Sequence, residues 1–223
     1  MKKHSWMNED TGLLGLIAIA CMICDHIGAA FFRQAVWLRV IGRVAFPLYA
    51  WGVAVGAEHT RDWRRFALRL LILGVISQPF YMFGMNHRFN QLNVLATLLC
   101  GLLAIEGVKG KKYWLTAAAL LFPCFVTTDY GVRGVLLVLL LWGVRGNTPA
   151  LCLCYAAFCI FWGGKTSVLW TRGAVTLRLQ TCAVLALPLM LWPRRARLKV
   201  PRAVAYGAYP AHLAVIWLMK QFL

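Results

Sequence analysis

Residues 12–32, GLLGLIAIACMICDHIGAAFF, decide the fold class. The run is 21 residues long and, apart from Asp25 and His26, almost wholly apolar. About 20 apolar residues cross the hydrocarbon core of a bilayer as an α-helix, so we predict a first membrane span here. Lys2 and Lys3 precede the run as they would in a signal peptide. Its full spanning length and its internal Asp25–His26 pair nevertheless favour a helix that is retained.

Outward from this run, apolar windows fill most of the 223 residues. Hydrophobic residues make up 61% of the chain and the mean hydropathy is +0.67, whereas soluble domains are roughly 45–50% apolar. We predict an all-α fold, a polytopic transmembrane helix bundle that forms a single integral membrane domain over residues 1–223. The fifth and sixth expected spans are short, and a broken or re-entrant form stays open for both. The nine spans lie near 12–32, 36–57, 66–84, 93–108, 113–127, 130–144, 149–163, 174–192 and 203–222.

Lysine and arginine residues set the expected orientation. The formal net charge is +17, and the basic clusters lie between apolar runs, at 61–65, 109–112 and 194–199. This placement suits loops that meet an anionic membrane face, and we expect contact with membrane lipid and no nucleic-acid partner. With the N-terminus inside, cytoplasmic segments hold fourteen Lys and Arg residues and outer segments hold six. The positive-inside rule therefore predicts a cytoplasmic N-terminus and an outer C-terminus.

The eight cysteines lie mostly within apolar runs, and Cys21 and Cys24 have the spacing of a redox or zinc motif. No second pair with metal-ligand spacing follows on a loop. Cysteine also packs as a small buried hydrophobe between helices. We therefore predict packing roles for these residues and no metal site.

Asp25 and Arg43 are charged residues at membrane depth. Such residues are costly in hydrocarbon and usually face the protein interior. At about 1.5 Å rise per residue, both lie roughly 10 Å below the outer edge of the hydrocarbon, on consecutive antiparallel spans. We predict an ion pair between them, which either forms part of a functional site or only locks the two helices together.

Two histidines, His26 and His212, also fall inside expected spans. His26 follows Asp25 directly, and neighbouring helical residues point about 100° apart, so Asp25 is a poor partner for its ring. Asp129 is an alternative orienting carboxylate. An ordinary interhelical hydrogen bond would explain either histidine alone. Together with Asp25 and Arg43, the two histidines indicate a site in one lipid-shielded chamber.

Further polar residues occur inside or beside the spans, and we assign them to substrate binding, with helix packing as the alternative. Pro79 lacks an amide hydrogen, and so it opens carbonyl groups in the preceding turn. Asn93 and Thr97 have the i, i+4 spacing of one helix face. The substrate-binding candidates are Ser77, Gln78, Asn93, Thr97 and Tyr130.

A basic cluster follows the second span. Topology alone would explain its charge, but arginine also binds phosphate in a bidentate manner. A seat for a polyanionic cofactor is therefore the second interpretation. The members of this basic cluster are His59, Arg61, Arg64, Arg65 and Arg69.

Several of these motifs resemble one known family. Residues 25–28, DHIG, and residues 41–50, IGRVAFPLYA, are similar to signatures of the TraX family, whose name-giving member acetylates the N-terminus of conjugative pilin. The block at 42–47 is the most specific part. Shorter similarities follow in order to the end of the chain, at His59–Arg61, Arg69–Leu70, Ser77–Pro79, Leu92–Asn93, Thr97–Leu98, Tyr130–Gly131, Tyr209 and His212–Leu213.

The resemblance implies a membrane acetyltransferase in the bacterial cytoplasmic (inner) membrane that takes acetyl-CoA as its donor. The acceptor stays open between a protein, such as a pilin N-terminus, and a glycan. His26 would be the general base, because imidazole titrates near neutral pH. Asp25 would orient Arg43, which would polarise the acetyl carbonyl or hold an acceptor carboxylate. His212 would be the rival base or an acetyl-accepting nucleophile, and the basic cluster would hold coenzyme A.

Two other classes of function stay open. A proton-coupled transporter or exporter would also use intramembrane Asp, Arg and His residues. However, the sequence shows no convincing inverted repeat, and transport has no obvious use for the basic cluster. A non-enzymatic scaffold would explain the helices and leave the buried charges without a role.

Overall fold

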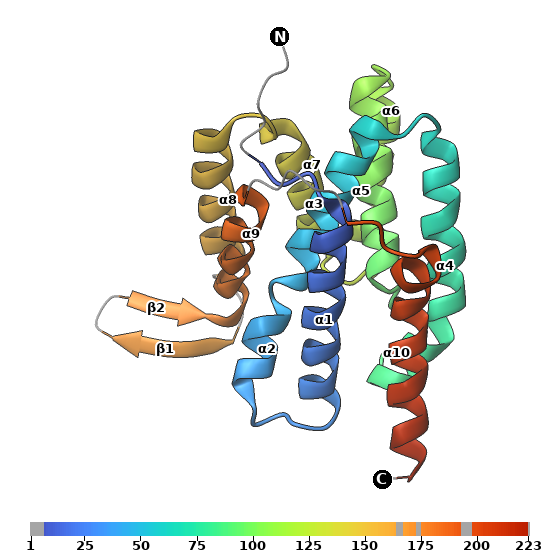
Figure 1. The fold of residues 1–223 in the computed structure, drawn as a ribbon, viewed down its shortest axis with the longest axis vertical. Helices are drawn as coiled ribbons and strands as arrows, with labels where there is room; N and C mark the ends of the chain where they lie inside the picture. Colours follow the sequence, from blue (N-terminus) through green and yellow to red (C-terminus); the bar gives the residue numbers. More distant parts are fainter. Residues whose placement is uncertain (1–6, 164–166, 173–174, 193–197, 223) are drawn as a thin grey trace. The chain divides into compact units, whose positions relative to one another are not determined.

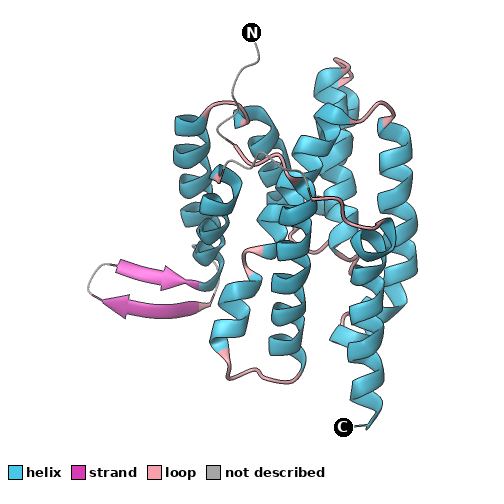
Figure 2. Cartoon of the chain, in the orientation of Figure 1, coloured by secondary structure: helices cyan, strands magenta, loops and turns pink. Residues whose placement is uncertain are grey.

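The computed structural model describes residues 7–163, 167–172, 175–192 and 198–222. These residues are mostly helical, which confirms the all-α prediction, and Figure 2 shows one two-stranded hairpin beside the helices. Among the described residues, three helical segments are long and apolar enough to cross a membrane: Thr11–Ala30, Val36–His59 and Trp63–Met85. The number of spans and the orientation of the N-terminus stay predictions, and two of the nine expected spans are not single helices, as described below.

The chain divides into two compact units, and each is described by itself. The first unit comprises Met1–Tyr49 and Gly143–Lys199, and the second comprises Ala50–Trp142 and Val200–Leu223. Helices α3 (Ala45–His59) and α7 (Gly131–Val144) each contribute residues to both units. Whether the chain acts as a single membrane domain stays a prediction.

The first unit begins with α1 (Thr11–Ala30), which Asp10 caps by accepting a hydrogen bond from the Leu13 amide. The expected second span, 36–57, falls within the segment Val36–His59, which is long and apolar enough to cross a membrane, but it is not one continuous helix. It forms α2 (Val36–Gly42) and α3, with Arg43 and Val44 in a turn between them. Pro47 explains the interruption, because it cannot donate to the Arg43 carbonyl four residues earlier and its ring collides with that carbonyl.

The expected span 174–192 is also wrong as a helix. After α8 (Thr148–Gly163), strands β1 (Val168–Arg172) and β2 (Val175–Arg178) pair antiparallel, with Trp170 opposite Leu177. A 3₁₀ segment η1 (Leu179–Ala186) and the short α9 (Leu187–Leu191) follow. β-Branched and aromatic residues suit a pleated strand, and here they outweigh the overall apolar character of the stretch.

The second unit holds most of α3, α4 (Trp63–Met85), α5 (Val94–Lys109), α6 (Tyr113–Phe125), most of α7 and α10 (Arg202–Phe222). In this unit α4 packs against both α5 and α10, and α5 packs against α6 (Figure 1). Glycine permits the close approach of α5 and α7. A Cβ atom at Gly101 would lie 2.7 Å from Val138, so no larger residue fits without a shift of the helices.

Candidate functional site

Asp25 and Arg43 form the ion pair that was predicted from their depth in consecutive spans. Arg43 Nη2 lies 2.6 Å from both carboxylate oxygens of Asp25. Both residues belong to the first unit, and their side chains are only 12% and 11% exposed. Gly42 permits this contact, because a Cβ atom there would lie 2.2 Å from the Asp25 Cβ. The turn between α2 and α3 thus brings Arg43 directly against α1.

Two residues that the sequence did not identify complete this Asp25 network, which consists of Asp25, Arg39, Arg43 and Gln180. Arg39 Nη1 donates to the main-chain oxygen of Asp25 at 3.1 Å and lies 3.2 Å from its carboxylate. Arg43 Nη1 donates to Gln180 Oε1 at 3.3 Å, and Arg43 Nε donates to the Arg39 carbonyl. Two guanidinium groups therefore share one carboxylate. Between Asp10 and Glu58, Asp25 is the only acidic residue in the sequence. Asp10 precedes Asp25 by fifteen positions, and Glu58 follows Arg43 by fifteen positions.

The spacing of the sequence could have revealed Arg39 but not Gln180. Arg39 precedes Arg43 by four residues, and this spacing places two side chains on one face of a helix. Arg39 is one of the six basic residues of the expected outer segments, and its contact with Asp25 also makes it a member of the network. Gln180 lies 137 residues from Arg43, in η1, where the sequence had suggested a spanning helix.

The two histidines lie in different units. His26 follows Asp25 on α1 in the first unit and is partly buried. His212 lies on α10 in the second unit, where its Nδ1 is 2.9 Å from the Ala208 carbonyl oxygen and its ring meets Tyr209 edge-on. A carbonyl only accepts hydrogen bonds, so Nδ1 of His212 carries the hydrogen. The chamber that would join His26 and His212 stays a prediction, as does the Asp129 contact to His26.

The basic cluster surrounds the start of α4 in the second unit. Asp62 caps α4 by accepting from the amides of Arg64 and Arg65, and it pairs with Arg65 Nε at 3.0 Å. The Arg64 guanidinium lies 5.7 Å from the ring centre of Trp63. The side chains of Arg61, Arg64, Arg65, Arg69 and His59 are all exposed.

Tyr206 is a further member of this region that sequence reasoning missed. Arg69 Nη1 donates to the Tyr206 hydroxyl at 3.1 Å, and Arg69 Nε donates to the Arg65 carbonyl. Tyr206 comes from α10, 137 residues along the chain. The exposed guanidinium groups, held by a helix cap and by a second helix, suit a polyanionic ligand such as the phosphates of coenzyme A.

Four of the five expected substrate-binding residues form two groups in the second unit. Gln78 and Asn93 contact each other, with Asn93 Nδ2 at 2.9 Å from Gln78 Oε1. Asn93 is the N-cap of α5 and not a residue inside that helix, so it and Thr97 do not share a helical face as expected. Thr97 Oγ1 instead donates to the Asp129 carbonyl, beside Tyr130. Ser77 is fully buried on α4, and its hydroxyl has no hydrogen-bond partner among the described residues.

His87 is a titratable residue that the sequence did not single out. Its ring stacks on Tyr81 with centroids 4.2 Å apart, and its Nδ1 lies 3.0 Å from Gln91 Oε1. Burial lowers the pKa of His87 below its ordinary value of 6.5, the charge of Lys220 lowers it further, and the Gln91 contact opposes both effects. His87 follows the end of α4, in the loop that leads to α5.

Acid is therefore expected to destabilise the second unit through His87. The unfolded ring takes up a proton near pH 6.5, and the folded ring does so only at lower pH, so the stability conferred by neutral His87 falls as the pH drops through 6.5. The measurement is unfolding in mild detergent at pH 7.5 and at pH 5.5. His87→Phe should unfold with a smaller loss of stability on acidification than the unchanged chain. An equal loss in both proteins would show that His87 is not responsible.

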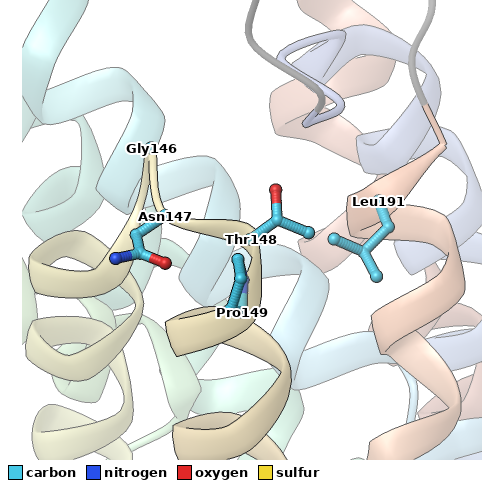
Figure 3. Close-up of a pocket in the computed structure, with 5 residues that line it drawn as sticks. All are labelled: Gly146, Asn147, Thr148, Pro149 and Leu191. Atoms are coloured by element: carbon cyan, nitrogen blue, oxygen red, sulfur yellow. The ribbon is translucent and has the colours of Figure 1, made fainter.

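Figure 3 shows a separate pocket of about 540 Å³ in the first unit. It is lined by Gly146, Asn147, Thr148 and Pro149 at the start of α8 and by Leu191 at the end of α9. Asn147 Oδ1 accepts from the Ala150 amide, so this side chain serves as a helix cap. None of the predicted site residues lines the pocket, and we assign no function to it.

Comparison with known proteins relates this chain to TraX proteins and to a fimbrial assembly protein. A family model described as TraX protein matches residues 11–220. The probable fimbrial assembly protein FimC, serogroup H1, of Dichelobacter nodosus is 28% identical, over 94% of this chain and 95% of that protein. Protein TraX of Escherichia coli is 27% identical over 60% of this chain, and Protein TraX of Escherichia coli strain K12 is 26% identical, also over 60% of this chain. The matched regions span 55% of the length of these two TraX proteins.

No solved structure matches the chain. The family model covers nearly its whole length, including every residue of the Asp25 network and of the basic cluster. The three apolar helical segments agree with insertion in a bilayer. The chain is a membrane protein, and it belongs to the TraX family.

Proposed function

We propose that this chain is an integral membrane acetyltransferase of the bacterial inner membrane. It would move an acetyl group from cytoplasmic acetyl-CoA to an amine or hydroxyl group on a protein or glycan at the membrane. One related protein is named for fimbrial assembly, and its sequence identity to this chain is close to that of Protein TraX. A fimbrial or pilin subunit is accordingly the first acceptor to test.

The Asp25 network is the observation that carries the proposal. The network consists of the Asp25–Arg43 ion pair, Arg39 and the buried amide of Gln180, and all four residues lie within the part of the chain that matches the family. Asp25 lies in α1, one of the segments able to cross a membrane. Charges in such a segment are costly, and where they occur they usually mark a functional site. A scaffold would have no need for them.

The proposed reaction forms a bond between the acceptor nitrogen or oxygen and the acetyl carbon and breaks the bond from that carbon to sulfur. His26 takes the proton from the acceptor as general base and passes it to the departing thiolate of coenzyme A. Arg43 faces the oxygen on which negative charge develops and stabilises that charge. Asp25 and Gln180 hold the guanidinium of Arg43 in position, and His212 is the alternative base.

The basic cluster would bind the phosphates of acetyl-CoA. Replacing Arg64 and Arg65 together with alanine should weaken acetyl-CoA binding about tenfold or more, because loss of roughly 1.4 kcal/mol of binding free energy gives a tenfold change. Calorimetric titration of the purified protein measures this change. A double replacement of Arg88 and Arg133 with alanine, which removes two exposed arginines of the same unit outside the basic cluster, serves as the control. Unchanged affinity of the arginine variant would mean that Arg64 and Arg65 contribute only to topology.

Transfer of label tests the function itself. The purified chain in lipid nanodiscs is incubated with acetyl-CoA labelled in its acetyl group and with fimbrial subunits whose N-terminal amine is either free or chemically blocked. We expect label on the free subunit and none on the blocked one. Uptake of a solute into vesicles driven by a pH gradient, with no transfer of label to any amine or hydroxyl acceptor, would instead support a transporter.

A further inference from the structure

The second unit contains a long apolar groove between α4, α5 and α6. Its volume is about 860 Å³, within the range of ligand-binding pockets in proteins. Its lining combines small residues, including Gly74, Ala96 and Ala118, with larger ones, including Leu71, Phe83 and Phe122. From Leu71 to Phe83 the groove follows α4 for about 18 Å, from the helical rise.

Gln78 and Asn93 are the polar side chains along the groove, and their hydrogen bonds are already nearly all made. Gln78 Oε1 accepts from both the amide and the Nδ2 of Asn93, and Gln78 Nε2 donates to the Gln91 carbonyl. Asn93 Nδ2 also donates to the Gly74 carbonyl, and its Oδ1 accepts from the Leu95 amide. These amides therefore bridge α4 and α5 and offer little to a ligand. An occupant of the groove meets hydrocarbon.

The groove lies along an exposed apolar side of α4. On this helix the large apolar side chains of Leu71, Val75 and Phe83 line the groove and are at least half exposed. α4 is one of the segments able to cross a membrane, and little of it is buried inside the protein. A hydrocarbon chain of the bilayer thus has direct access to the groove.

Two basic residues lie at one end of the groove. Arg64 precedes Leu71 by seven residues, two helical turns, and so lies on the same side of α4. Lys112 is the N-cap of α6, one turn before Leu115 of the groove lining. Lys109 donates to the Ala57 carbonyl at 2.6 Å, which holds the end of α5, and with it the start of α6, beside the turn that leads to α4. The side chains of Arg64 and Lys112 are both exposed.

We propose that the groove binds one acyl chain of an anionic phospholipid, with the lipid phosphate at Arg64 and Lys112. The acyl chain alone would gain little free energy by moving from the bilayer into the groove, because bilayer hydrocarbon is as apolar as the groove. The two positive charges supply the selection for a negative headgroup. This site lies outside the Asp25 network, and it shares Arg64 with the basic cluster. The lipid measurement below contains no acetyl-CoA, so its outcome does not depend on the proposed acetyl transfer.

Native mass spectrometry of the full chain in mild detergent tests the groove. The protein is offered equal amounts of phosphatidylglycerol and phosphatidylcholine, and retained lipid is counted. We expect at least a roughly tenfold preference for phosphatidylglycerol, from two basic residues near the headgroup. Ala118→Trp, which fills the groove, should lose the bound lipid. Ala117→Trp, at the neighbouring exposed position outside the groove lining, should retain it.

A second groove-filling variant, Ala96→Phe on α5, should also lose the bound lipid, so that the test does not depend on Ala118→Trp alone. Equal lipid retention by the groove-filling variants and by Ala117→Trp would overturn the proposal, and so would equal retention of the two lipids by the unchanged chain. The double variant Arg64→Glu and Lys112→Glu should lose the preference for phosphatidylglycerol. Lys199→Glu, a charge reversal in the first unit, should not. Persistence of the preference in the double variant would show that the headgroup lies elsewhere.

Discussion

Replacing Asp25 with alanine is expected to destabilise the first unit by about 3–5 kcal/mol, because it leaves buried guanidinium charge without its partner. Arg43 makes its two shortest contacts to the Asp25 carboxylate, and Arg39 makes one more. Neither Asp25 nor Arg43 has enough exposure for water to replace these contacts. Urea unfolding in mild detergent measures the loss, against the unchanged chain at the same pH.

Two further variants separate charge from shape. Arg39→Gln should cost less than Asp25→Ala, since the Arg39 side chain is 29% exposed and the Asp25–Arg43 pair remains. The double variant Asp25→Leu and Arg43→Met should recover most of the stability, because a buried ion pair replaced by apolar residues is often nearly neutral. The double variant should still fail to transfer acetyl groups. If Asp25→Ala unfolds like the unchanged chain, the ion pair contributes nothing to the fold.

The ion pair could be predicted because it depends on few assumptions. Helical rise and the antiparallel order of two consecutive spans place Asp25 and Arg43 at one depth. The same reasoning treated residues 36–57 as one helix, although Pro47 breaks it directly after Arg43. The error did not move Arg43 away from Asp25, because α2 and α1 still pack together. In the turn between α2 and α3, the guanidinium of Arg43 also donates to Gln180.

The contacts that could not be predicted come from distant parts of the chain. Gln180 and Tyr206 each lie 137 residues from the arginine that they contact. Hydrophobic periodicity describes single elements and carries no information on such pairings. In 174–192 the apolar composition suited a span, but a hairpin and a 3₁₀ segment form there. Short apolar runs are ambiguous between strand and helix, and the pairing of β1 with β2 decides the outcome.

His26→Ala is expected to lower the rate of acetyl transfer by about 10²- to 10⁴-fold, the usual contribution of a general base. Because His26 is only partly buried and Asp25 keeps its arginine partners, unfolding in urea should change little. The affinity for acetyl-CoA should also stay unchanged, since the basic cluster lies on another part of the chain. The measurement is a single-turnover assay with the enzyme in excess of labelled acetyl-CoA.

The control for this variant is His87→Ala, which removes a histidine from the loop after α4 and should leave the rate of transfer intact. His212→Ala distinguishes the two intramembrane histidines. A large loss of rate in His212→Ala together with normal turnover in His26→Ala would assign the proton transfer to α10. Large losses in both would show that transfer requires both histidines. Normal turnover in both variants would remove histidine from the chemistry and leave Arg43 as the main group in the Asp25 network able to act on the acetyl carbonyl.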